Sequence, residues 1–186
     1  MTPQQVAALA LAALLVFWMV GAYNRLMALR NAIGAAWAQI DEALRHRGQA
    51  VPPLVQALRE PLAAEQGALD TLLAVHGQAH SAAAALGARP LAMAAAAAWL
   101  AAETALASAA SRVLALLEQH AELRADAAVS ALAATWREGE LRLGFARQLF
   151  DAAALAYNEA LGQWPTRWLA RLFGFSAAAR IRSFLP

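Results

Sequence analysis

Residues 6–47 read VAALALAALLVFWMVGAYNRLMALRNAIGAAWAQIDEALRHR, and this proline-free stretch decides the fold. No residue from Val6 to Tyr23 is charged, and bulky apolar side chains recur along about 27 Å of helix, close to the ~30 Å hydrocarbon thickness of a bilayer. After Tyr23 the apolar residues continue at spacings of three and four beside a polar face. The sequence therefore predicts a transmembrane anchor over residues 1–24 whose helix continues into the body of the protein.

The same apolar stretch has two other readings, a cleaved signal peptide and a buried core helix. A signal peptide usually carries lysine or arginine before its apolar region, whereas residues 1–5 carry only the α-amino charge, so an anchor is favoured. Arginine is absent before the span but follows it at Arg25, Arg30, Arg45 and Arg47. The positive-inside rule then places the N-terminus outside and the body in the cytoplasm, which predicts a single-pass membrane protein.

The rest of the chain has the composition of helices. Hydrophobic residues make up 61% of the 186 residues, and the excess is mostly alanine, the best helix former and a poor strand residue. The net charge of +2 does not indicate nucleic-acid binding. Without cysteine the chain has no disulfide and no thiolate site.

Proline and glycine divide the body into helical segments. Pro52-Pro53 predicts a break and the start of a second helix, and Pro61 predicts a kink or a fresh start. Residues 87–90 predict another stop and start, with a third helix reaching about His120. Asp126 is a candidate cap for a fourth. The expected fold is all-α: a transmembrane helix continuing into an antiparallel bundle of about four long helices over residues 25–162, with a short basic-aromatic tail over 163–186.

The fourth helix has the clearest periodicity, with near-heptad spacing typical of coiled-coil packing. Its stripe consists of Val129, Leu132, Trp136, Leu143, Phe150 and Tyr157, with Gly139 and Ala146 at small positions. The charged residues of the fourth helix favour an exposed surface with several salt bridges. The sharper hypothesis is an interhelical polar layer that sets helix register, joining the fourth helix to the first. Its candidate residues are Arg30, Asn31, Asp41, Glu140, Arg147 and Asn158.

The tail combines arginine with aromatic residues, and no acidic residue follows Glu159. Pro165-Thr166 predicts a short helix that ends at Gly174. This helix has three possible sites: the bundle, an anionic membrane surface, or another partner. The residues that would dock are Trp164, Arg167, Trp168, Arg171, Phe173 and Phe175.

Two collinear blocks of sequence differ from a generic helical pattern. The first contains Tyr23-Asn24-Arg25-Leu26, Ala36-Trp37, Gln39-Ile40-Asp41 and Val51-Pro52; the second contains Ala146-Arg147-Gln148, Tyr157-Asn158, Trp164-Pro165 and Leu172-Phe173-Gly174-Phe175. Together these blocks resemble the LemA family of bacterial membrane-associated helical proteins, and the resemblance implies that the membrane is the bacterial inner membrane. The alanine-rich middle third matches only loosely. The resemblance implies a single-pass membrane protein with an antiparallel helical body and no established biochemical activity.

No pattern in the sequence indicates an enzyme or a cofactor. Nothing matches a nucleophile motif, a phosphate-binding loop or a nucleotide fold. His76 and His80 lie four apart and would face the same way on a helix, but Gly77 stands where a metalloprotease motif has glutamate. Packed or solvated histidines are therefore favoured over a metal site.

The leading functional hypothesis is a membrane-anchored scaffold that binds lipid through residues 6–23, forms a homo-oligomer and presents its helices to protein partners. The alternative is a peripheral lipid-binding or envelope-remodelling protein that acts through the basic-aromatic tail. An enzyme ranks last.

Overall fold

The computed structural model describes residues 2–181, so residues 182–186 of the tail lie outside the described part of the chain. Over the described residues the protein is helical and has no strand. The elements are α1 (Pro3–Gly48), α2 (Val51–Leu58), the 3-10 helix η1 (Ala63–Glu65), α3 (Gln66–Ala88), α4 (Met93–Gln119), α5 (Ala121–Ala125), α6 (Ala127–Gly162) and α7 (Thr166–Leu172).

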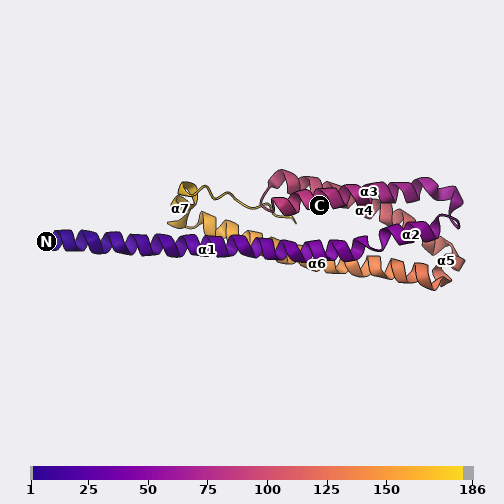
Figure 1. Ribbon diagram of the computed structural model, residues 1–186, viewed down its shortest axis with the longest axis horizontal. Helices are drawn as coiled ribbons and strands as arrows, with labels where there is room; N and C mark the ends of the chain where they lie inside the picture. Colours follow the sequence, from indigo (N-terminus) through magenta and orange to yellow (C-terminus); the bar gives the residue numbers. More distant parts are fainter. Residues whose placement is uncertain (1, 182–186) are drawn as a thin grey trace.

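The helices form an elongated antiparallel bundle (Figure 1). Helices α1 and α6 run antiparallel over most of their length, and the hairpin of α3 and α4 packs along them. Helix α2 continues α1 towards the far end, where α5 leads into α6. The N-terminal part of α1 projects beyond the bundle, and α7 lies against α1 where it leaves the bundle. The predicted all-α fold with four long helices is confirmed.

Local signals in the sequence place the helix ends. Thr2 caps α1 in a capping box with Gln5, and Pro3 occupies its first turn. Helix α1 ends at Gly48, and Pro52-Pro53 falls in the first turn of α2, where the missing N–H groups cost no hydrogen bond. Asp126 accepts hydrogen bonds from the N–H groups of Ala128 and Val129, at 2.8 and 3.0 Å, and so caps α6.

The predicted interruptions also fall where expected. Pro61 lies between α2 and α3, so the helix starts afresh after it. Helix α3 ends at Ala88 and α4 begins at Met93, on either side of Pro90. The sequence patterns did not predict two short elements, the 3-10 helix η1 and the helix α5 between α4 and α6.

Two apolar cores fill the bundle. The proximal core, on the side of the projecting helix, surrounds Trp37, which packs edge-on against Trp99 and Phe150 at centroid distances of 5.5 and 6.2 Å. The distal core lies towards α2 and α5 and includes Leu58 and Trp136. The heptad stripe of α6 is buried across both cores.

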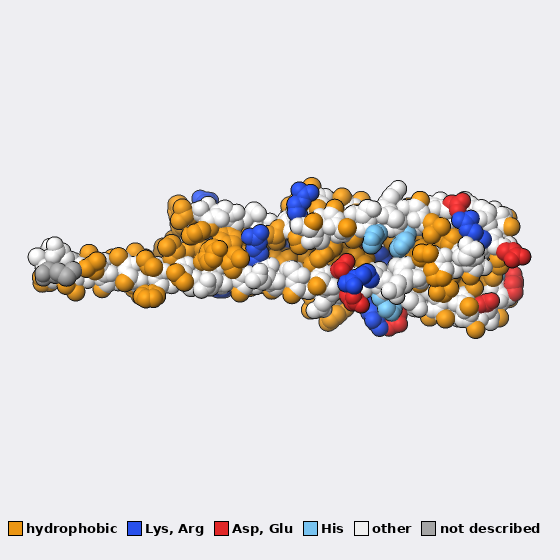
Figure 2. Space-filling view, in the orientation of Figure 1, with side chains coloured by type: hydrophobic (Ala, Val, Ile, Leu, Met, Phe, Trp, Pro, Cys, Tyr) orange, Lys and Arg blue, Asp and Glu red, His pale blue; other side chains and the backbone are white. Residues whose placement is uncertain are grey.

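The projecting part of α1 has no packing partner. By length and composition α1 is apolar enough to cross a membrane, and none of its most apolar window is buried. Helix α4 passes the same test with 33% of its window buried, and it packs against α3 within the bundle. Figure 2 shows the projecting end without charged side chains, whereas the body carries charges of both signs.

Candidate functional site

A buried layer of four charged residues crosses the bundle between the two cores. Arg47 stands in the last turn of α1, Glu103 in the middle of α4, and Glu140 and Arg147 on α6. Arg47 and Glu103 are only 4% and 6% exposed, values that charged residues reach only when they are paired. We refer to these four residues as the ion-pair layer.

Glu103 is the centre of the layer. It accepts two hydrogen bonds from Arg47, from Nη1 to Oε2 at 2.9 Å and from Nη2 to Oε1 at 2.8 Å. It accepts a third from Arg147 Nη2 to Oε2 at 2.9 Å. Arg47 also donates to Glu140. The layer therefore joins α4 to both α1 and α6, and its formal charges cancel.

Tryptophan rings cover the two guanidinium groups. The Cζ atom of Arg47 lies 4.9 Å from the ring centroid of Trp136 in the distal core. The Cζ atom of Arg147 lies 5.0 Å from the ring centroid of Trp99 in the proximal core. Such cation-π contacts are stronger where water is excluded. Aromatic residues of the two cores thus flank the layer, while the Glu140 side chain stays 38% exposed.

Burial and ion pairing shift the pKa values of the two arginines in opposite directions. Burial lowers the pKa of Arg47, but the hydrogen bonds and charges of Glu103 and Glu140 outweigh it and raise the pKa overall. For Arg147 burial outweighs the attraction of the same carboxylates, and its pKa is lowered. Both side chains remain cations, because arginine does not lose its proton in proteins.

The polar layer exists, but its membership differs from the sequence hypothesis. Glu140 and Arg147 belong to it, and their partners are Arg47 and Glu103. The other predicted residues lie elsewhere: Arg30 and Asn31 are exposed, Asp41 pairs with Arg45 at 2.9 Å, and Asn158 binds the backbone of Ala178. Arg30, Asn31 and Asp41 differ because they sit off the buried stripe of α1.

The residues that the sequence reasoning missed carry a recognisable signal. Arg47 continues the heptad series of buried positions Leu26, Ile33 and Ile40 on α1. Glu103 likewise occupies the series of buried positions Ala96, Ala110 and Leu117 on α4. A charged residue on an otherwise apolar heptad stripe predicts a buried ion pair or a break in packing.

Gly139 makes the layer possible. A Cβ atom at this position would lie 2.5 Å from the Cβ atom of Arg47 and 2.9 Å from its Cα atom. Helices α1 and α6 therefore approach each other closely at Gly139, next to Glu140. The expectation that Gly139 fills a small position of the α6 stripe agrees with this contact.

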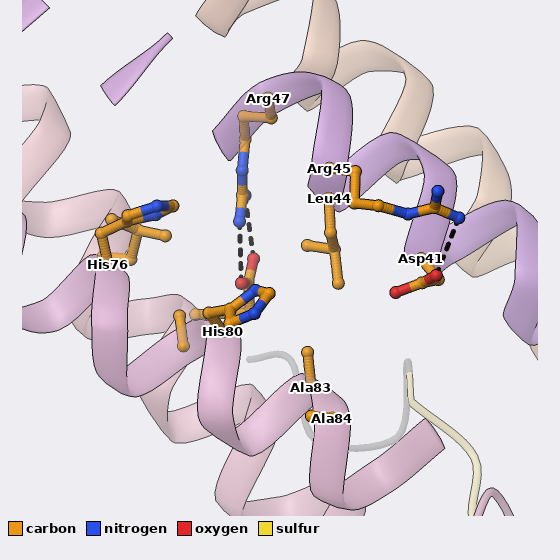
Figure 3. Close-up of a pocket in the computed structure, with 11 residues that line it drawn as sticks. Asp41, Leu44, Arg45, Arg47, His76, His80, Ala83 and Ala84 are labelled. Atoms are coloured by element: carbon orange, nitrogen blue, oxygen red, sulfur yellow. Dashed lines mark hydrogen bonds and ion pairs between the residues drawn. The ribbon is translucent and has the colours of Figure 1, made fainter. Parts of the chain in front are cut away.

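A small cavity of about 50 Å³ opens beside the layer. Figure 3 shows Arg47 pointing into it from the end of α1, with His76 and His80 on adjacent turns of α3. Among residues 2–181, no group of three histidine, cysteine or acidic side chains is arranged to hold a metal ion. The Arg47 cation in the same space also disfavours a second cation.

Acidification is expected to destabilise the bundle through His76. Burial lowers the pKa of His76 below its ordinary value of 6.5, and the positive charge of Arg47 lowers it further. Because the unfolded chain then binds the proton more readily than the folded chain, this contribution to stability is complete above pH 6.5 and is lost as the pH falls below it.

Denaturant unfolding on both sides of this pH measures the effect. The His76→Gln variant should lose less stability on acidification than the parent protein. The same change at His120, at the far end of α4, tests whether the effect is specific to His76. An unchanged loss in His76→Gln contradicts the assignment.

The tail packs on the bundle through one face of α7 and exposes the other. Leu169 and Ala170 are buried with Leu26 of α1 and Ala160 of α6. On the other side Trp164 and Leu172 are 73% and 75% exposed, and Trp168 and Phe173 are also exposed. Arg167 and Arg171 extend from the same helix. Helix α7 is therefore both a docking element and an exposed aromatic surface.

After α7 the chain returns along the bundle. Asn158 donates to the carbonyl of Ala178 at 2.9 Å and accepts from its N–H at 2.8 Å. Asp151 accepts from the N–H of Ile181 at 2.6 Å. Phe175 packs edge-on against Tyr23 of α1, at a centroid distance of 5.8 Å. Asn158, Asp151 and Tyr23 thus hold residues 175–181 against the bundle, and Asn158 has no part in the ion-pair layer.

These features define a class of all-α proteins in which one long, apolar N-terminal helix extends directly into an antiparallel bundle. The LemA family model matches residues 36–182, most of the chain, and the protein belongs to the LemA family. The resemblance seen in the two sequence blocks is confirmed. No curated protein matches the chain in sequence.

Proposed function

We propose that the protein is a single-pass membrane protein that holds a helical scaffold at the membrane surface. One observation carries the proposal: residues 6–18 of α1 project from the bundle without charge and are all exposed, with Phe17 76% exposed. Exposed apolar surface costs roughly 25 cal/mol per Å² in water, and a bilayer removes that cost. The proposal includes no catalytic activity.

The anchor inserts with a modest free-energy gain. The eight large aliphatic and phenylalanine side chains between Val6 and Val20 contribute about −2.4 to −4.8 kcal/mol on an insertion scale, before the polar ends are counted. Because α1 is unbroken from Pro3 to Gly48, the bundle follows rigidly from the bilayer. The arginines that follow the span favour a cytoplasmic bundle and an external N-terminus.

Replacing Leu14 by arginine is expected to release the protein from membranes. Arginine at the centre of a span costs about 2.5–3.5 kcal/mol, which offsets most of the insertion gain. The parent protein should stay in the pellet after an alkaline wash, whereas Leu14→Arg should move to the supernatant. Leu141→Arg, on the exposed face of α6, is the matched control and should stay in the pellet.

Labelling of single cysteines in intact cells measures the orientation of the protein in the membrane. The chain has no cysteine, so Thr2→Cys and Ser81→Cys each create a single thiol. An impermeant maleimide should label Thr2→Cys in intact cells and leave Ser81→Cys unlabelled until the membrane is opened. The reverse pattern would refute the proposed orientation.

The scaffold role is supported by an exposed apolar face on α6. Leu141 and Phe145 are 77% and 61% exposed and lie one turn apart. Phe145 borders a groove of about 400 Å³ between α1 and α6, which also contains Ala38, Glu42 and Arg142. We propose that a second copy of this chain covers the face.

Symmetry and charge favour a second copy as the occupant. Membrane anchors hold two copies in parallel, so a twofold axis along the membrane normal brings the same face of each copy together. Glu42 and Arg142 carry opposite charges in one groove and are paired within the chain, with Arg45 and Glu138, so two copies can meet there without net like-charge repulsion. Small side chains such as Ala38 let the helices approach closely.

A short bis-maleimide is expected to link two copies of Phe145→Cys within native membranes. The result should be a covalent dimer, because the two thiols face each other across the proposed interface. Ser81→Cys, on the exposed side of α3, serves as the control and should remain monomeric. Adding Leu141→Arg should suppress the Phe145→Cys dimer. A Phe145→Cys protein that stays monomeric excludes this interface.

A further inference from the structure

Residues 164–173, which we name the collar, expose an apolar surface next to the base of the proposed anchor. Among the described residues, the large hydrophobic side chains left exposed fall mainly in two places, 6–20 of α1 and the collar. In the collar they are Trp164, Trp168, Leu172 and Phe173. Exposed aromatic surface of this extent marks an interaction site in a folded protein.

The collar packs against α1 around Tyr23 and Leu26, where the helix leaves the bundle. The ring of Phe173 packs against Tyr23 at a centroid distance of 5.2 Å, and Leu169 is buried against Leu26. From Pro3 to Tyr23 the helix rises about 30 Å, the hydrocarbon thickness of a bilayer. A bilayer that covers the projecting part of α1 therefore ends at the level of the collar.

The collar is joined to the anchor by an apolar groove. Met19, Val20, Tyr23 and Phe173 line a space of about 190 Å³ between α1 and the end of α7. Its lining is apolar apart from the tyrosine hydroxyl and belongs partly to the proposed membrane span. A lipid acyl chain fits this chemistry, whereas water gains no hydrogen bonds there.

The charge of the collar is positive and uncompensated. Arg167 and Arg171 form no ion pair with any carboxylate of residues 2–181, and no acidic residue follows Glu159. Both guanidinium groups lie 5.8 Å from the ring of Trp168. Arginine and tryptophan on one short helix are typical of segments that lie in the headgroup region of an anionic membrane.

We propose that the collar lies in the headgroup–acyl boundary of an anionic leaflet, on the bundle side of the membrane. The aromatic side chains enter the acyl boundary, and Arg167 and Arg171 bind lipid phosphate groups. The collar thereby sets the depth at which the bundle stands. This inference rests on the proposed anchor, because the anchor brings the collar to the bilayer.

Single labelled cysteines in the full-length protein test the depth of the collar. Leu172→Cys, Leu14→Cys and Ser81→Cys each carry one polarity-sensitive fluorophore at an exposed position, so the fold is preserved. Each variant is reconstituted into vesicles of phosphatidylcholine mixed with phosphatidylglycerol. Iodide in the water and bromine on the acyl chains compete to quench the label. Circular dichroism checks helicity.

The label at Leu172 should show several-fold less iodide quenching than the label at Ser81, and clear quenching by brominated lipid. If Leu172 matches Ser81 while Leu14 is protected, the anchor stands and the collar proposal is overturned. If Leu14 is open to iodide, the anchor fails, and the depth proposed for the collar is overturned with it even where Leu172 is protected. If the labels at Leu14 and Leu172 are both open to iodide, the anchor and the collar proposals both fail.

Neutralising Arg167 and Arg171 tests whether these side chains bind lipid phosphate groups. Arg167→Gln with Arg171→Gln should restore part of the iodide quenching of the Leu172 label in the mixed vesicles. The two changes should have little effect in vesicles of phosphatidylcholine alone. Equal effects in both vesicles overturn the phosphate contact. Protection that depends on protein concentration assigns the collar to a second protein copy and overturns the proposal.

Discussion

Replacing Glu103 by alanine is expected to lower the free energy of unfolding by about 3–5 kcal/mol, the usual cost of breaking a buried ion pair from one side. The change removes the acceptor of three hydrogen bonds, two from Arg47 and one from Arg147. Arg47 then stays buried with Glu140 as its one carboxylate, and Arg147 loses its ion pair. Denaturant unfolding in detergent, followed by circular dichroism, measures the loss.

The control is a surface pair of the same chemistry. Glu138 binds Arg142 one turn away on α6, and both side chains are more than half exposed. Glu138→Ala should cost no more than about 1 kcal/mol, since water screens the pair. Removing Arg147 together with Glu103 should cost less than the sum of the two single changes, because one unpaired cation is removed with its partner. A Glu103→Ala protein as stable as Glu138→Ala would contradict the buried layer.

Replacing Gly139 by alanine is expected to cost about 3 kcal/mol, at the upper end of the range for overpacked sites. The new methyl group would meet the Cβ and Cα atoms of Arg47, at 2.5 and 2.9 Å. A backbone atom cannot move aside as a flexible side chain can, so α1 and α6 must separate. That separation also pulls Glu140 away from Arg47.

Gly144 on the same helix provides the matched control. No atom lies within 4 Å of a Cβ atom built there. Gly144→Ala should raise the free energy of unfolding by roughly 0.5–1 kcal/mol, because alanine loses less backbone entropy than glycine in a helix. Gly139→Ala should thus lower the free energy of unfolding, and Gly144→Ala should raise it. If both substitutions change it in the same direction, Gly139 is not a close-contact position.

The helix boundaries could be predicted because their causes are local. Pro52-Pro53, Pro61 and Asp126 act within one turn of chain, and the structure begins or ends helices beside each of them. Helix α5 was missed because its five residues are too few to show a period. The apolar span of α1 was equally evident, since bulk and the absence of charge are properties of the sequence.

The membership of the ion-pair layer could not be predicted in the same way. Arg47 and Glu103 are 56 residues apart, and their helices belong to different parts of the bundle. Their heptad positions indicate that each is buried, but not which residue each one meets. Asp41, a candidate from the polar face of α1, follows the buried position of Ile40 and pairs with Arg45 on the outside of the helix instead.

The two faces of α7 show the same difference between what the sequence determines and what tertiary packing decides. Sequence alone establishes an all-helical chain, its breaks, an apolar first helix and an arginine-aromatic tail, because propensity, capping and hydrophobic period act over a few residues. Packing selects which face of α7 is buried against Leu26 and which stays exposed. It also brings Arg47 to Glu103, because contacts between distant residues depend on how whole helices are rotated and aligned when they associate.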